Sequence, residues 1–388
     1  MLPDCSPVLA SLLPHALSGW LTGQGTWLLI LIAIVAMAVV IRGADWLVEG
    51  AAGIAQRLGM PKVVVGATIV SLGTTSPEAA VSVLAAFSGD AGLAIGNGVG
   101  SIIADTGLIF GVGCLLTRLP ADRFILSRQG WVQFGSAVML AALCYLLWAM
   151  QGNSATIDRW AGVIFALALV GYLIISIRWA RQHPVGGRGD YEEKETEAVH
   201  DVKSPAVPDL PELDQTPHDT GGHGWGALIG MGLGGLLLVI LAGDVLVSSV
   251  TEVAERWQVP DAVIASTIVA LGTSLPELVT GITAIRKKHP ELLVGNVIGA
   301  DILNVLFVIG VSSLAAPLPL IETGADGQAI PGGNTILTLM LPAMLVMLLF
   351  FRACIFPASR RGYFARWMGA PLVAMYLAYL ALSYFVSQ

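Results

Sequence analysis

Two short stretches of this chain carry the same polar motif inside apolar surroundings, and this repetition constrains the fold more than any other feature. The first stretch, residues 66–78, reads GATIVSLGTTSPE, and the second, residues 265–277, reads ASTIVALGTSLPE. Equivalent residues are separated by 199 positions, for example Thr68 and Thr267 (267 minus 68). Because every matching pair keeps this separation, the chain is interpreted as the product of an internal duplication.

The correspondence between the two halves extends beyond the motif without a gap. It begins at Asp45 and Asp244 and continues to Gly111 and Gly310. Scattered Val and Leu matches could arise from hydrophobic composition alone. A shared GT-x-x-PE, followed at equal spacing by a shared GN-x-x-G, could not, so chance similarity is rejected.

The composition indicates a membrane protein. With 55% hydrophobic and 12% charged residues in 388 positions, the chain is too apolar for a soluble domain. A transmembrane helix needs about 20 apolar residues, and on this measure the sequence predicts an all-α polytopic membrane protein with ten transmembrane helices. No basic patch suggests a nucleic-acid partner, the four cysteines show no metal-binding spacing, and no cofactor is expected. The predicted spans are 26–47, 62–87, 93–116, 131–150, 160–179, 226–250, 262–286, 292–314, 335–351 and 368–386.

The positions of Lys and Arg predict the orientation, because cytoplasmic loops retain positive charge. With both termini outside, eighteen of the twenty basic residues belong to the inward side, and only Arg159 and Arg256 fall outside. Five spans in each half is an odd number, so the second half must enter the membrane from the opposite side. The sequence therefore predicts two inverted five-helix repeats, an arrangement that indicates a secondary transporter with its site near the membrane midplane.

Four segments follow from this layout. Residues 1–25 are expected to form an extracytoplasmic N-terminal segment, 26–181 the first five-helix repeat, 182–224 a linker and 225–388 the second repeat. The linker holds five prolines and an acidic run, which predicts a disordered cytoplasmic tether. Its four histidines could sense a metal or pH, but a solvated tether is the favoured interpretation. We expect a monomer in the lipid bilayer of a cell membrane, such as a bacterial inner membrane.

Two carboxylates, Glu78 and Glu277, lie at membrane depth in the repeated motif. Burying such a group there costs about 2.5 kcal/mol or more, so it is normally retained for an ion, a proton or a partner. Thr74 and Thr273 stand four residues earlier and share a helix face with the glutamates. Each motif therefore offers a hydroxyl and a carboxylate in register.

A proline directly precedes each glutamate. Pro77 has no N–H, so the carbonyl of Gly73 loses its helical partner, and the same holds in the second half. A carbonyl freed in lipid must find another donor or a cation. Carboxylate, hydroxyl and bare carbonyl oxygens are the hard ligands that Ca²⁺ and Na⁺ prefer. An ordinary proline kink would explain one such motif, but it explains two copies with Glu poorly.

The next span in each half adds further polar residues. It opens with GN-x-x-G, whose glycines are interpreted as helix-packing positions, and nine residues after Gly96 lies Asp105, with Asn304 at the equivalent place. Ser101 and Asp105 share a helix face. Asp301 is a fourth carboxylate about one turn from Asn304, and either an inward orientation or a helix-end or inter-helix pairing is open. Carboxylates packed together in low dielectric repel one another, so this centre is expected to need cations.

At these residues the chain resembles the cation/calcium exchanger superfamily, most closely its prokaryotic sodium/calcium exchangers. The resemblance covers both repeats and the ten-span layout. It implies that Glu78 and Glu277 bind Ca²⁺ with help from Thr74 and Thr273, and that the first and sixth helices slide as a gating pair. It also implies that Na⁺ uses the same glutamates together with Ser71, Thr75, Ser101, Asp105, the carbonyl of Ala270, Ser274 and Asn304.

Three departures from the family pattern stand out. Asp105 and Asn304 are exchanged between the repeats, Ile102 and Ala300 replace residues that are commonly Asn and Ser, and Asp301 stands where Asn is common. These departures leave open the number of Na⁺ ions and a role for K⁺ or H⁺. Proton-coupled relatives typically carry Glu soon after the GN pair, and its absence here favours Na⁺.

The expected function is secondary active antiport of Na⁺ against Ca²⁺ by alternating access, with both ions as substrates. The alternatives within this class are an H⁺-coupled or K⁺-dependent antiporter of Ca²⁺ or another divalent cation. An intramembrane enzyme could use Glu78 and Asp105 as an acid–base pair, but it would have no need of Glu277 at the mirrored depth. A channel is disfavoured because three clustered acids would bind divalent ions too tightly for fast passage.

Overall fold

The computed structural model describes residues 20–21, 23–182, 224–257, 274–321 and 333–386. Nearly all of the predicted N-terminal segment and linker therefore lies outside the described residues, as does the first half of the predicted span 262–286. The helical elements of the first half are α2 (Thr26–Leu58), α3 (Lys62–Val65), η2 (Gly66–Val70), α4 (Ser71–Thr74), α5 (Ser76–Phe87), α6 (Ala91–Ala104), η3 (Asp105–Phe110), α7 (Gly111–Leu116), α8 (Arg123–Gln151), η4 (Gly152–Ser154) and α9 (Arg159–Gln182). Those described in the second half are α11 (Trp225–Arg256), α14 (Leu275–Arg286), α15 (Pro290–Leu303), η7 (Asn304–Ile309), α16 (Gly310–Ala315), η8 (Ile336–Met340), α17 (Leu341–Arg361), η9 (Arg366–Met368) and α18 (Gly369–Val386).

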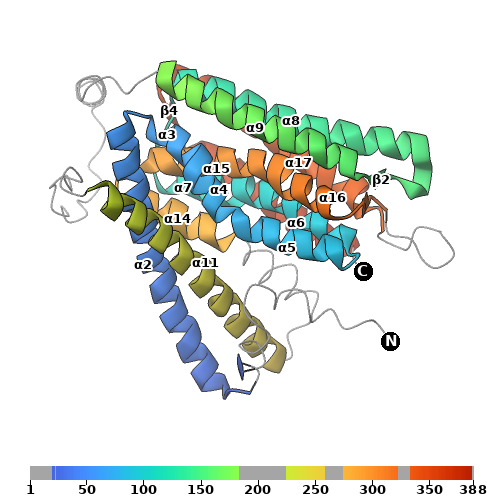
Figure 1. Cartoon of the computed structure of the whole chain (residues 1–388), viewed down its shortest axis with the longest axis horizontal. Coiled ribbons are helices and arrows are strands. Elements are labelled where there is room, and N and C mark those ends of the chain that lie inside the picture. The colour runs from blue at the N-terminus through green and yellow to red at the C-terminus, as the bar shows by residue number, and fades with distance from the viewer. Residues whose placement is uncertain (1–19, 22, 183–223, 258–273, 322–332, 387–388) are drawn as a thin grey trace.

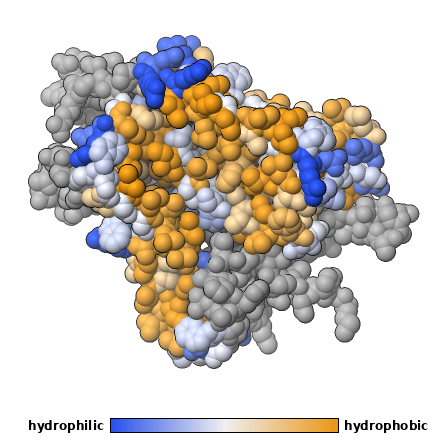
Figure 2. Space-filling view, viewed as in Figure 1, coloured by the Kyte–Doolittle hydropathy of each residue, from blue (hydrophilic) through white to orange (hydrophobic). Residues whose placement is uncertain are grey.

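Apolar helices dominate the described chain. Seven are long and apolar enough to cross a membrane, and residues 62–87 form an eighth candidate that is bent by 42°. On the outer face of α9, Leu167 and Val170 are each more than half exposed, which suits contact with lipid. Apolar residues cover most of the visible face in Figure 2, and hydrophilic residues gather toward its ends. The helical, multi-span prediction is confirmed, while the total of ten spans stays a prediction.

The internal repeat is visible in the element boundaries. Helix α5 begins at Ser76 and α14 at Leu275, which is again a separation of 199 (275 minus 76). The same separation relates α6 to α15, the π-helical turn η3 to η7, and α7 to α16. Equivalent sequences have thus adopted the same succession of a helix, a second helix, a π-helical turn and a short final helix.

Two short antiparallel ribbons tie the halves together. In one, β1 (Leu119–Pro120) pairs with β4 (Tyr363–Phe364), and in the other, β2 (Thr156–Ile157) pairs with β3 (Leu318–Pro319). Next to the first ribbon, the Phe110 ring of η3 packs edge-on against Phe364, with 5.0 Å between ring centroids. These contacts fix η3, which carries part of the site, inside the bundle.

Helices α2 and α11 cross each other, and their far halves extend away from the rest of the molecule (Figure 1). Glycines allow their backbones to approach closely, because a Cβ on Gly50 would come within 2.6 Å of the backbone nitrogen of Gly232. Helix α2 continues eleven residues past the predicted span end at Leu47. Its last residue is Leu58, and the following residue, Gly59, has the left-handed backbone conformation (φ of 60°) that closes many helices.

Candidate ion-binding site

The first repeated motif lies on a broken helix. Segments α3, η2 and α4 run to Thr74, and α5 begins at Ser76 after the break. Pro77 occupies the first turn of α5, where its missing N–H costs no hydrogen bond. Helix α14 begins in the same way, with Pro276 in its first turn. Glu78 and Glu277 therefore stand at helix N-termini, where the helix dipole favours their negatively charged form.

The two glutamates lie deep in the protein and belong to one centre. Each is 1% exposed, and each feels the charge of another acid: Glu78 that of Asp105, and Glu277 that of Glu78. Across the halves, the Thr75 hydroxyl lies 3.5 Å from Glu277 Oε1. The two copies of the motif, predicted to converge, are thus brought together by the fold.

Asp105 and Asn304 also meet. The amide nitrogen of Asn304 lies 3.5 Å from Asp105 Oδ2, and both side chains are 1% exposed. These residues are repeat equivalents (304 minus 105 is 199), so this position contacts its own counterpart where the halves join. Each residue begins a π-helical turn, η3 or η7, a distortion that is frequent at functional sites.

Hydroxyl groups of the first motif line the same region. Thr74 Oγ1 donates to Asn296 Oδ1 at 3.3 Å, and Ser71 Oγ lies 3.4 Å from the backbone oxygen of Thr68. Ser101 and Ser274 are buried. Thr273 and Ala270, two further candidate ligands, lie outside the described residues.

The GN-x-x-G motif does more than the packing predicted for it. The glycines of its second copy do pack: a Cβ on Gly295 would clash with the Val63 carbonyl oxygen, and one on Gly299 would come within 2.5 Å of the Ala67 carbonyl oxygen. Its asparagines brace the site as well, since Asn97 Nδ2 donates to the Glu78 backbone oxygen at 3.1 Å and Asn296 accepts from Thr74. The asparagine repeated at the same place in both halves was the sequence signal for this second role.

Several buried oxygens in this centre have no hydrogen-bond donor among the described residues. None of the ion pairs formed by the described residues reaches them, and no three His, Cys, Asp or Glu side chains of the described chain form a metal-binding group by themselves. Any cation here would consequently take hydroxyl, amide or carbonyl oxygens beside the carboxylates. The unpaired oxygens are Glu78 Oε2, Asp105 Oδ1, Ser274 Oγ, Glu277 Oε2 and Asn304 Oδ1.

Asp301 is paired between helices. Its Oδ2 accepts from Thr106 Oγ1 and from Gln133 Nε2, both at 2.5 Å. Sequence reasoning left this orientation open and did not single out Thr106 or Gln133. A signal for Gln133 existed, because Gln129, Gln133 and Ser136 recur at helical spacing within one apolar span.

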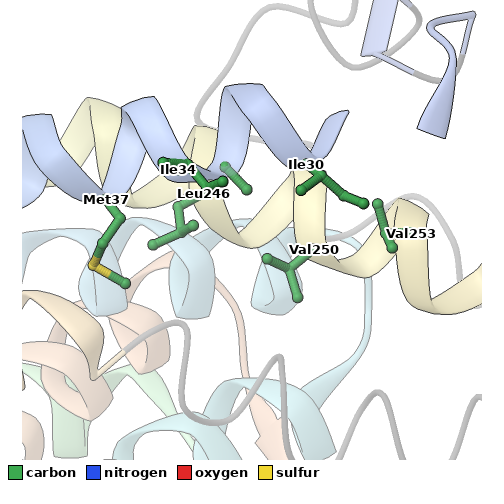
Figure 3. Close-up of a pocket in the computed structure, with 7 residues that line it drawn as sticks. Ile30, Ile34, Met37, Leu246, Val250 and Val253 are labelled. Atoms are coloured by element: carbon green, nitrogen blue, oxygen red, sulfur yellow. The ribbon is translucent and has the colours of Figure 1, made fainter. Parts of the chain in front are cut away.

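An apolar groove between α2 and α11 is separate from this centre. Its volume is about 400 Å³, and the side chains that Figure 3 labels come from these two helices alone. It offers no oxygen ligand from its lining side chains, so it is not a candidate ion site. Its lining residues are Ile30, Ala33, Ile34, Met37, Leu246, Val250 and Val253.

Comparison with known proteins agrees with this architecture. The family described as "Sodium/calcium exchanger protein" matches residues 28–178 and 227–385. The sodium/calcium exchanger MaX1 of Methanosarcina acetivorans is 29% identical over 373 residues, covering 92% of this chain and 98% of MaX1. The putative antiporter CaxA of Alkalimonas amylolytica is 30% identical over 295 residues, covering 76% of this chain and 83% of CaxA.

A solved structure shares the fold. The sodium-calcium exchanger NCX_Mj superposes with a TM-score of 0.68 at 22% identity, covering 92% of this chain and 99% of that structure. The family consists of transporters, so the enzyme alternative falls away. The chain is therefore a multi-pass membrane transporter that belongs to the sodium/calcium exchanger protein family.

Proposed function

We propose that this protein is a secondary active antiporter that exchanges Na⁺ for Ca²⁺ by alternating access and exports Ca²⁺ from the cytoplasm. The observation that carries the proposal is the set of buried, unpaired oxygens contributed by both halves at Glu78, Glu277, Asp105 and Asn304. Three of these side chains are carboxylates whose charges act on one another. A cation is the partner that suits this set of oxygens.

The chemistry of the oxygens favours Ca²⁺ and Na⁺. Both ions prefer oxygen ligands, and Ca²⁺ accepts a flexible set of carboxylate, hydroxyl and carbonyl oxygens. In the proposed division, Glu78, Glu277, Thr74 and Thr273 hold Ca²⁺. Na⁺ takes the glutamates with the remaining candidates, which are Ser71, Thr75, Ser101, Asp105, Ala270, Ser274 and Asn304. Since both ions need the same glutamates, they compete, and competition at one centre gives exchange rather than leak.

The proposed layout is ten spans in two inverted repeats, with both termini outside and residues 182–224 in the cytoplasm. The ribbons support it. Ribbon β1–β4 joins two loops that the Lys and Arg positions assign to the cytoplasm, and ribbon β2–β3 joins two loops assigned to the outside. Because such short ribbons cannot cross a bilayer, paired loops must share one side. The distribution of positive charge and the strand pairing thus agree.

A flux experiment tests the function. In proteoliposomes loaded with Na⁺, radioactive Ca²⁺ is expected to enter and accumulate, and uptake should collapse when the Na⁺ gradient is removed. Glu78→Gln and Glu277→Gln should each abolish uptake, because one carboxylate fewer leaves Ca²⁺ too little negative charge. Glu291→Gln is the matched control, since Glu291 is about 30% exposed and pairs with Lys62 outside the centre.

The same vesicles separate the alternatives. Uptake that follows a pH gradient and ignores Na⁺ would replace the proposal with proton-coupled exchange. Uptake that requires K⁺ together with Na⁺ would make it a K⁺-dependent exchanger. Ca²⁺ movement that persists without any counter-ion gradient and does not saturate would indicate a channel.

A further inference from the structure

Asp301 is a buried carboxylate for which the proposed exchange cycle has no role. It lies on α15 and is 1% exposed. Its Oδ2 accepts from the Thr106 hydroxyl on η3 and from the Gln133 amide on α8. Both donors are neutral, and Oδ1 has no donor among the described residues. The ionised form of this carboxyl has no counter-charge among the described side chains, which is costly inside a membrane, so a nearby cation is needed to favour it.

The repeat shows that the fold does not require this acid. The residue equivalent to Asp301 is Ile102 (301 minus 199), and the residue equivalent to Thr106 is Val305 (106 plus 199). Ile102 and Val305 are both fully buried. In the mirrored position, the same pair of helical turns is thus built with two apolar side chains. A feature present in only one of two equivalent places serves something other than the shared architecture.

Asp301 adjoins the half of the site that contains Asp105. Thr106, its hydroxyl partner, directly follows Asp105 in η3, and Asp301 is, after Glu277, the second acid whose charge acts on Asp105. The main charged neighbours of the two glutamates are instead Asp105 for Glu78 and Glu78 for Glu277. Asp301 is therefore placed to influence an ion at Asp105 more than an ion between the glutamates.

We propose that Asp301 is a positioning residue for Na⁺. Its hydrogen bond to Thr106 holds the π-helical turn that carries Asp105. A monovalent cation at Asp105 favours the ionised form of Asp301, and the negative charge of that form then strengthens the attraction of the cation to the centre. This inference rests on the proposed exchange of Na⁺ for Ca²⁺, in which Asp105 belongs to the Na⁺ ligands and not to the Ca²⁺ ligands.

The test compares the two ions in the same variants. Asp301→Asn keeps the size and removes the charge, and Asp301→Glu keeps the charge. Thr106→Val removes the hydroxyl and reproduces the residue of the mirrored contact. Ile102→Val, at the position equivalent to Asp301, is the matched control. Half-saturating Na⁺ and Ca²⁺ are measured by exchange in proteoliposomes, and independently by the rise of the thermal midpoint of the purified protein with each ion.

Loss of the Asp301 charge is expected to raise half-saturating Na⁺ roughly threefold to tenfold and to change half-saturating Ca²⁺ less than twofold. Asp301→Glu should recover part of the Na⁺ affinity, Thr106→Val should lose a smaller part, and Ile102→Val should change neither value. Equal shifts in half-saturating Na⁺ and Ca²⁺ would show a merely structural role and overturn the inference. Unchanged Na⁺ affinity would overturn it as well. If Asp301→Asn does not fold, the same comparison of half-saturating Na⁺ with half-saturating Ca²⁺ is made in Thr106→Val. Wild-type protein whose Ca²⁺ uptake ignores Na⁺ would instead refute the proposed function.

Discussion

At the scale of single residues, His289 is a titratable group that links folding stability to pH. It lies in the turn between α14 and α15, with Nδ1 2.9 Å from Lys62 Nζ. Burial, and then the charge of Lys62, lower the pKa of His289 from its ordinary 6.5 to about 4. The folded protein thus holds a neutral imidazole next to an ammonium group.

The consequence is a loss of stability in acid. Because the folded-state pKa lies below the unfolded-state value, the unfolded chain takes up this proton first as the pH falls. The contribution of the neutral His289 side chain to folding stability is complete above about pH 6.5 and is lost progressively as the pH falls toward 4. We expect His289→Gln to reduce the difference between the thermal midpoints at pH 7 and pH 5. An unchanged difference in the variant would show that His289 is not the group responsible.

At the scale of elements, one lysine of the second half holds α2 through two of its carboxylates. Lys287, just after α14, places Nζ 3.1 Å from Glu49 Oε2 and 3.9 Å from Asp45 Oδ1. The two carboxylates lie one turn apart on α2, and all three side chains are 25–29% exposed. Partly exposed pairs of this kind contribute about 0.2–1 kcal/mol, so the contact biases the docking of α2 without locking it.

Lys287→Gln should therefore lower the thermal midpoint at low salt, and high salt should narrow the gap to wild type because it screens the pair. The single variant Lys287→Glu should lower the thermal midpoint further. Adding Glu49→Lys should recover most of that loss, since opposite charges face each other again. Lys288→Gln serves as the neighbouring control. A double variant no more stable than Lys287→Glu alone would contradict the assigned contact.

Element positions were largely predictable, whereas their ends and lateral contacts were not. Pro77 predicted an interruption, and the break falls at Thr75 because proline belongs in the first turn of the new helix. The end of α2 was placed too early because hydropathy reports the edge of the lipid and not the end of a helix. The contact between Gln133 and Asp301 joins residues 168 positions apart. Which face of α8 meets α15 depends on packing that no local pattern encodes.

At the scale of the whole molecule, the repeat relation makes the site residues predictable as pairs. Glu78 and Glu277 could be found because each half repeats the same acid, and both prove to be buried in one centre. Asp105 and Asn304 break the symmetry chemically but not geometrically, since their side chains contact each other. The acid therefore occupies a shared position that either half could supply.

This shared position leads to a prediction about exchange of the two residues. Asp105→Asn leaves two amides in contact and removes one charge, so it should raise half-saturating Na⁺ by roughly tenfold or more. Adding Asn304→Asp returns one acid and one amide to nearly the same place and should recover most of the affinity, as measured by Na⁺-dependent Ca²⁺ uptake in proteoliposomes. Recovery would be incomplete because the new acid is followed in η7 by Val305, whereas Asp105 is followed in η3 by Thr106, which bonds to Asp301. A double variant with no higher Na⁺ affinity than Asp105→Asn alone would show that the two halves do not present one common position to the ion.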